Sequence, residues 1–216
     1  MVKLYVEGGG DTAVLKAACR EGFAKFIEKA GLNGHMPRIV ACGSRRNAYE
    51  SFCTALALGD SAMLLIDSED PVAAIYQSGL PDAWLPWQHL AQRPGDHWPR
   101  PANATDNTCH LMAQCMEIWL LANGVALKAY FGQGFKETHI PTASSQVETI
   151  AKPQVFQALA HATRDCKTKT SYNKGQHSFK LLGLVDPAKV AAASPWANRF
   201  TQALRAQGMN ENRLQN

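Results

Sequence analysis

The chain has 216 residues, of which 46% are hydrophobic and 19% are charged. This length and composition exclude wholesale disorder and allow one domain to bury a full core without disulfides. The formal net charge is +4 at pH 7, the longest apolar runs are too short to cross a bilayer, and no signal peptide is visible, so we expect a cytoplasmic protein with no membrane partner.

Strands and helices alternate through the first third of the chain. Residues 3–6 read as a short strand, and a turn of three glycines separates them from a helix that Asp11 or Thr12 can cap. The buried face of this helix is expected to carry Val14, Ala17, Ala18 and Ile27. The next elements expected are a strand at 38–42, a helix at 47–58 and an apolar strand at 61–66. This β-α-β-α-β order predicts an α/β fold, with a parallel sheet flanked by helices.

The region after the third strand is less regular. A short helix is expected at 72–77, and residues 80–108, rich in Pro, Trp and His, are expected to form a long inserted loop. Trp84, Trp87 and Trp98 are expected to fix this loop to the core, with stacking on nucleic-acid bases as the alternative. The later elements expected are a strand at 110–114 and helices at 116–122, 153–163, from 187, and 195–207. We expect a single domain over residues 1–208, in which residues 161–216 form a basic, helical C-terminal part.

Acidic residues follow two of the predicted strands. Glu7 comes directly after the first strand, and Asp67, Glu69 and Asp70 come after the third. Carboxyl ends of parallel strands meet at one edge of a sheet, so we expect Glu7 to converge with Asp67 and Glu69, the last two on the same side of an extended chain. Such carboxylates repel unless a cation compensates, and Mg²⁺ or Mn²⁺ is the expected occupant. Asp70 is either a further metal ligand or a helix cap.

Four motifs resemble those of known families. V-E-G-G-G-D at Val6–Asp11 and L-L-I-D-S-E-D at Leu64–Asp70 resemble the two signature motifs of the Toprim fold, although Glu69 stands where that fold has Asp. Two further motifs, Q-C-M-E-I-W-L-L-A at 114–122 and Y-N-K-G-Q-H-S-F-K-L-L-G-L-V-D-P at 172–187, are similar to a Toprim-like family, the domain of unknown function 4276. The resemblance covers nearly the whole chain and implies a Toprim-like sheet.

The resemblance also implies a function. Toprim proteins include nucleases that act on nucleic-acid phosphodiesters with Mg²⁺, and relatives of this kind lie beside an ATPase partner in phage-defence or mobile-element loci. By motif position, Glu7 would be the general base or a metal ligand, and Asp67 and Glu69 would be metal ligands. We therefore expect a metal-dependent nuclease with an ATPase partner.

Related Toprim nucleases add further acids and a late lysine. By resemblance, Glu117 is a candidate metal ligand, and Lys174 or Lys180 is a candidate catalytic residue. The alternatives are a Glu117 that points to solvent beside its apolar run and a solvated loop that carries the lysines.

Basic residues concentrate between positions 161 and 185, where five cations accompany one acid, Asp165. Such a patch can bind a polyanion, and an ordinary solvated surface is the alternative. The candidate nucleic-acid-binding residues are Arg45, Arg46, Lys167, Lys169, Lys174, His177 and Lys180. DNA is the expected nucleic acid, ahead of RNA.

Two other functions fit the sequence. The first is a non-catalytic Toprim-like module that docks onto a partner ATPase. The second is dinucleotide binding at Gly8-Gly9-Gly10, which ranks low because no acid follows the second strand to bind a ribose.

Overall fold

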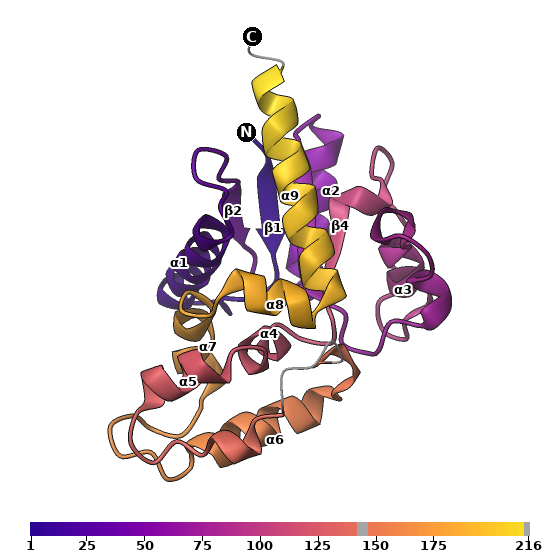
Figure 1. Cartoon of the computed structure of the whole chain (residues 1–216). Helices are drawn as coiled ribbons and strands as arrows, with labels where there is room; N and C mark the ends of the chain where they lie inside the picture. Colours follow the sequence, from indigo (N-terminus) through magenta and orange to yellow (C-terminus); the bar gives the residue numbers. More distant parts are fainter. Residues whose placement is uncertain (142–146, 214–216) are drawn as a thin grey trace.

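A parallel sheet lies at the centre of the molecule (Figure 1), with strand order β2-β1-β3-β4. The computed structural model describes residues 1–141 and 147–213, with side chains up to residue 208. The strands are β1 (Lys3–Val6), β2 (Arg38–Ala41), β3 (Ala62–Asp67) and β4 (Cys109–Met112). The predicted α/β class is confirmed and is consistent with a Toprim-like fold, although β4 begins and ends earlier than predicted.

Helices α1 (Ala13–Lys29) and α2 (Arg45–Ala57) connect the first three strands. Each begins at a hydroxyl cap. The side chains of Thr12 and Ser44 each accept a hydrogen bond from the third backbone N–H of their helix. This satisfies a donor that has no partner within the helix. Thr12, one of the two expected caps, is therefore the residue that begins α1.

The remaining chain is mainly helical. The 3-10 helices are η1 (Ala74–Tyr76), η2 (Pro81–Ala83), η3 (Asp106–Thr108), η4 (Glu137–His139) and η5 (Val147–Thr149). The further α-helices are α3 (Pro86–Gln92), α4 (Glu117–Leu121), α5 (Gly124–Phe131), α6 (Lys152–Thr163), α7 (Lys174–Leu182), α8 (Pro187–Ala193) and α9 (Pro195–Arg213). Helices α5 and α7 occupy segments where no helix was predicted. No helix within the described ranges has the length and apolar character needed to cross a membrane.

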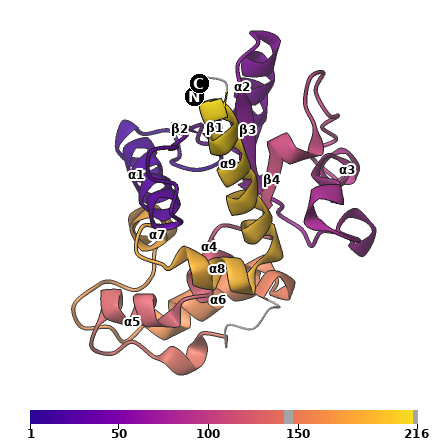
Figure 2. The same cartoon turned by 45° about the horizontal axis from the view of Figure 1, so that its top comes forward.

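These helices divide between the strand tips and the two faces of the sheet. In Figures 1 and 2, α4 to α7 lie beyond the carboxyl ends of the strands, and α9 runs back along the sheet. Helices α1 and α9 share one core with sheet residues such as Val6 and Leu65. Helix α2 and the segment around α3 share the other core with sheet residues such as Leu64 and Ile66.

The packed face of α1 differs from the prediction. Val14 is 78% exposed and Ala17 is exposed, whereas Phe23, Phe26 and the predicted Ile27 are fully buried. Large aromatic side chains bury more apolar area than alanines do, so they decide which side of the helix faces the sheet.

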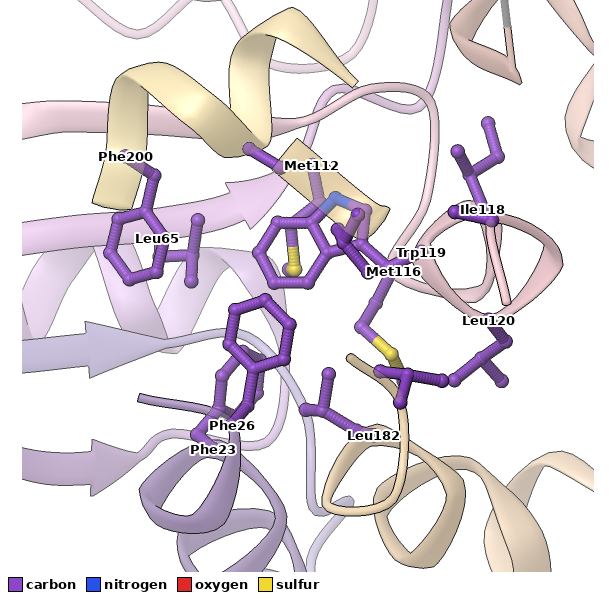
Figure 3. Close-up of a cluster of buried hydrophobic side chains, with 14 of the residues drawn as sticks. Phe23, Phe26, Leu65, Met112, Met116, Ile118, Trp119, Leu120, Leu182 and Phe200 are labelled. Carbon is purple, nitrogen blue, oxygen red and sulfur yellow. The ribbon is translucent and has the colours of Figure 1, made fainter. Parts of the chain in front are cut away.

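Trp119 lies at the centre of the larger core (Figure 3). Its ring stacks on Phe26 with the centroids 5.1 Å apart and meets Phe23 edge-on at 6.5 Å. Phe200 of α9 packs 6.2 Å from the same ring. Burial of a side chain of this size contributes roughly 2–3 kcal/mol, so this cluster holds α1, α4 and α9 together against the sheet.

The segment 80–108 was predicted to be one long inserted loop. This prediction is wrong, because the segment contains η2, α3 and η3. Trp84 and Trp87 are 7% and 2% exposed. Trp84 packs against Trp196 of α9, with the ring centroids 4.6 Å apart. The expectation that these two tryptophans fix the segment to the core is confirmed.

Arg199 of α9 holds both ends of this segment. Its buried guanidinium donates to the backbone oxygens of Pro81 at 2.8 Å, Asp106 at 2.7 Å and Cys109 at 2.9 Å. It also lies 3.1 Å from Nδ1 of the buried His110. One side chain therefore ties η2 and η3 to β4.

Candidate metal centre

The strand order changes direction at β1, because β2 lies on one side of it and β3 and β4 lie on the other. In open α/β sheets a ligand crevice forms at such a point, outside the carboxyl ends of the strands. Glu7 follows β1 directly, and Asp67 is the last residue of β3. Both residues therefore stand at the crevice.

Gly9 lets the chain turn sharply after Glu7. Its φ is +85°, a conformation that L side chains rarely adopt, and a Cβ at this position would lie 2.8 Å from Cα of Lys16. Only glycine fits this close approach between the turn and α1. The turn is therefore tight and leaves Glu7 at the strand tip.

Three carboxylates converge as the sequence predicted. Glu7, Asp67 and Glu69 each offer one oxygen, and these oxygens lie within 4.8 Å of one another. We call these three residues the acidic cluster. Oε2 of Glu7 also accepts a hydrogen bond from the backbone N–H of Asp67 at 3.0 Å, which joins the two strand tips.

Glu69 joins the acidic cluster through an uncommon backbone conformation. The N–H groups of Ser68 and Glu69 donate to the backbone oxygens of Met112 and Gln114, so this segment stays beside the end of β4. At Glu69 the chain turns with φ of 64°. The left-handed region costs a non-glycine residue roughly 1–3 kcal/mol. The predicted extended conformation through Asp67 and Glu69 is therefore wrong, because the chain turns at Glu69.

Burial makes the acidic cluster unfavourable in its ionised form. The side chains of Glu7, Asp67 and Glu69 are only 17%, 4% and 24% exposed. Desolvation and the charge of Asp67 raise the pKa of Glu7 to about 8. Desolvation and the charge of Glu117 raise the pKa of Asp67 to about 6. A cation among these oxygens would restore the ionised forms.

Lys152 supplies a cation from the protein itself. Its Nζ lies 2.6 Å from Oε2 of Glu69 and 3.4 Å from Oδ2 of Asp67. Burial raises the pKa of Glu69, but the hydrogen bond and charge of Lys152 outweigh burial, so this pKa falls below its usual value. Burial likewise lowers the pKa of Lys152, and the charges of Asp67 and Glu69 reverse the shift and raise it.

Two more cations stand around the acidic cluster. The guanidinium of Arg45 donates to the backbone oxygen of Asp67 and lies 3.6 Å from Oε2 of Glu7. Nζ of Lys174 lies 3.7 Å from Oε1 of Glu117, and the charges of Glu117 and Asp67 raise the pKa of Lys174 against its burial.

Arg45, Lys152 and Lys174 are the first residues of α2, α6 and α7. A cation at a helix N-terminus is opposed by the helix dipole. Three such cations beside three helix N-termini offset the charge of the neighbouring carboxylates, which makes the binding of an anion such as phosphate beside them more favourable. The acids can hold a metal, and the surrounding groups can hold its anionic ligand.

Glu117 does not point to solvent, which was one alternative, because its side chain is fully buried. Its Oε1 accepts from Oγ of Ser178 at 3.1 Å and lies 3.4 Å from the Tyr172 hydroxyl. Its Oε2 has no hydrogen-bond partner among the described residues. Glu117 lies outside the acidic cluster, but its negative charge contributes to the raised pKa of Asp67.

A comparison with known families identifies the family of this chain. A family described as a domain of unknown function (DUF4276) matches residues 6–205. The chain belongs to this family. The match covers all three residues of the acidic cluster and both motifs of the second half of the chain. No curated protein and no solved structure matches the chain.

Other predicted site residues of this DUF4276 chain lie away from the acidic cluster. The carboxylate of Asp70 is 57% exposed and 2.8 Å from Nε of Arg93, and Ala73 precedes η1 where a cap would stand. Asp70 is therefore an ion-pair partner of Arg93, not part of the acidic cluster and not a cap.

The lysines of α7 separate into two positions. A solvated loop, the alternative considered for these lysines, is wrong, because residues 174–182 are helical. Lys174 begins the helix beside the acidic cluster, whereas Lys180 lines a groove with Glu21 and Lys25 of α1. The structure therefore brings only Lys174 to the site.

The prediction that His177 contacts nucleic acid is wrong. Its side chain is 1% exposed, and Nδ1 accepts a hydrogen bond from the backbone N–H of Asn173 at 2.9 Å. A buried ring packed against Phe131 cannot reach a nucleic acid. Lys167 and Lys169 are exposed, as is Arg46, so these predicted contacts remain accessible.

Lys152 was missed by the sequence reasoning. It stands immediately before Pro153, at the start of a predicted helix. A basic residue at this position works against the helix dipole, and that conflict was the available signal. Asp96 and Arg93 were also missed. Their ion pair at 3.2 Å flanks the site, and no pattern in the sequence indicates it.

A pocket of about 540 Å³ opens beside the acidic cluster. It is lined by Glu7, Ser44, Arg45, Arg46, Glu69, Arg93, Gly95, Asp96 and Trp98. Two residues of the acidic cluster therefore share a wall with three arginines.

Proposed function

We propose that this protein is a metal-dependent phosphodiesterase that cleaves nucleic acid, with Mg²⁺ or Mn²⁺ held by Glu7, Asp67 and Glu69. The observation that carries the proposal is the approach of three carboxylate oxygens to within 4.8 Å of one another. Hard oxygen ligands suit these two ions. A bound ion of this kind polarises a phosphoryl oxygen and lowers the pKa of a bound water.

The chain's own residues would position the substrate. Lys174, whose side chain is 56% exposed, can bind an oxygen of the scissile phosphate. Arg45 is held by Glu7 and Asp96 and contributes positive charge beside it. Glu7 can ligate the metal or accept the proton of the attacking water. Lys152 now pairs with Glu69 and Asp67, so at least one of these ion pairs must loosen when a metal takes their oxygens.

We propose DNA as the nucleic acid and an ATPase as the partner, in a phage-defence or mobile-element system. Both proposals rest on the resemblance to Toprim nucleases. The exposed lysines at positions 167 and 169 support a polyanionic substrate in general.

A cleavage assay tests the proposal. The purified protein, alone and with its neighbouring ATPase, is incubated with plasmid and single-stranded DNA plus Mg²⁺ or Mn²⁺. Glu7→Ala and Asp67→Ala should each abolish cleavage, whereas Glu28→Ala, at an exposed acid of α1, should leave cleavage unchanged. Undiminished cleavage by both site variants would refute the proposed site.

The second candidate is a non-catalytic module that docks onto an ATPase. The ion pairs of Lys152 favour it, because they give Glu69 and Asp67 a positive partner without a metal. Under this function, no condition of the assay yields cleavage, and the protein still binds its ATPase.

A further inference from the structure

The pocket beside the acidic cluster gives a substrate access to Glu7 and Glu69, which line it. Its lining includes Glu7 and Glu69 of the acidic cluster together with Arg46, Gly95 and Trp98. A volume of about 540 Å³ lies within the range of sites that hold one small ligand. A ligand in this pocket would therefore touch the acidic cluster at one end.

The outer wall of the pocket is held in place by stacking and ion pairs. Trp98 stacks on Tyr49 of α2 with the centroids 4.6 Å apart and the planes 6° apart. The guanidinium of Arg45 lies over the Trp98 ring at 5.2 Å, and Asp96 binds both Arg45 and Arg93. The Trp98 ring is engaged by these neighbours, so it shapes the wall and is not a free stacking platform. The pocket exists before any ligand enters.

Arg46 is the cation of the pocket that remains available to an anion. Its side chain is 80% exposed, and the ion pair that it makes within the described part of the chain, with Glu50 on the next turn of α2, is at the surface, where such pairs contribute little. Arg45 and Arg93, by contrast, both pair with Asp96 of the pocket, and Arg45 also lies near Glu7. Arg46 can therefore bind a phosphate without losing a strong partner.

The depth of the acidic cluster limits the form of the substrate. The side chains of Asp67 and Glu7 are 4% and 17% exposed, so a scissile phosphate must enter the recess with an adjoining nucleoside. A base that is paired and stacked within a duplex cannot enter such a pocket unless it is extruded, which has a free-energy cost. An unpaired nucleotide enters without that cost.

We infer that this pocket binds one unpaired nucleotide next to the scissile phosphate, with Arg46 on the neighbouring phosphate. The protein then acts on single-stranded nucleic acid or on an unpaired end, and not on intact duplex. This inference rests on the proposed function and names its substrate class.

Binding measured without turnover tests this inference. Fluorescence anisotropy follows the full-length protein, with Ca²⁺ in place of Mg²⁺, on a labelled single-stranded oligodeoxynucleotide and on its blunt duplex. The single strand should bind at least roughly tenfold more tightly. Arg46→Glu should weaken single-strand binding by about tenfold or more. Arg38→Glu, at an exposed arginine on the opposite end of the sheet, should leave it unchanged.

The outcomes separate the inference from the proposed function. Equal binding of single strand and duplex, or an Arg46→Glu variant that binds as well as the unmodified protein, would overturn the inference even if the protein cleaves DNA. Preferential single-strand binding through Arg46 supports the inference even if no cleavage occurs, and in that case the nuclease proposal alone fails.

Discussion

Lys152 governs how the acidic cluster behaves without a metal. Its ammonium lies between oxygens of Glu69 and Asp67, at 2.6 and 3.4 Å. Carboxylate oxygens of the same two residues would bind a metal. Two cations cannot share them without repulsion, so Lys152 and the metal compete.

Lys152→Met should therefore tighten Mn²⁺ binding. If the ion pairs of Lys152 oppose the metal by about 1.4 kcal/mol, the affinity should rise about tenfold. Isothermal titration calorimetry measures the affinity directly. Lys189→Met, at an exposed lysine of α8, is the matched control and should bind Mn²⁺ as the unmodified protein does. Weaker Mn²⁺ binding by Lys152→Met would mean that Lys152 supports the metal site and does not compete for it.

Glu148 shows how one residue joins two elements. It belongs to η5, and its Oε1 accepts from the backbone N–H of Trp196, in the first turn of α9, at 2.9 Å and from the hydroxyl of Ser194, the residue before α9. Burial outweighs these two hydrogen bonds and raises the pKa of Glu148 from 4.5 to about 6. The contact therefore depends on pH.

The sign follows from the raised pKa. Folding takes up a proton at Glu148 between pH 4.5 and about 6, so the stability that this group contributes is full below pH 4.5 and is lost as pH rises through 6. Glu148→Gln removes the titration. Relative to this variant, the unmodified protein should lose about 2 kcal/mol of unfolding free energy across that window, measured by urea unfolding at both ends. A difference that does not change with pH would contradict this account.

Arg199 acts at the scale of elements, because it joins α9 to η2, η3 and β4. Arg199→Met keeps most of the side chain's volume but leaves several buried carbonyl oxygens without a donor. We expect a loss of about 3 kcal/mol or more in unfolding free energy, measured by urea unfolding. Arg20→Met, at an exposed arginine of α1, should change it little. A change of similar size in both variants would refute the role given to Arg199.

At the scale of the whole molecule, local patterns predicted the sheet and the acidic cluster. The apolar strand at 61–66 and the acids at the ends of two strands carry this information in short stretches of sequence. Arg199 and Lys152 could not be placed in this way, because their partners Cys109 and Glu69 lie 90 and 83 residues away. Such contacts arise only when separate elements pack.

Helix α7 was missed for a related reason. Its first residues, Lys174 and Gly175, and the preceding Asn173 look like a turn. The helix is stabilised by burial of Leu181 and Leu182 in the larger core, and short helices depend on such packing more than on propensity. The proposal that the site binds a metal does not depend on that error, because its three carboxylates come from the predicted strand ends.

The most direct test of the metal centre is a crystal of the protein soaked in Mn²⁺ and measured by anomalous diffraction. We predict a Mn²⁺ peak bound by carboxylate oxygens of Glu7, Asp67 and Glu69, with Nζ of Lys152 withdrawn from at least one of them. A saturating soak that leaves this position without a peak, and leaves Lys152 paired with both Asp67 and Glu69, would contradict the account.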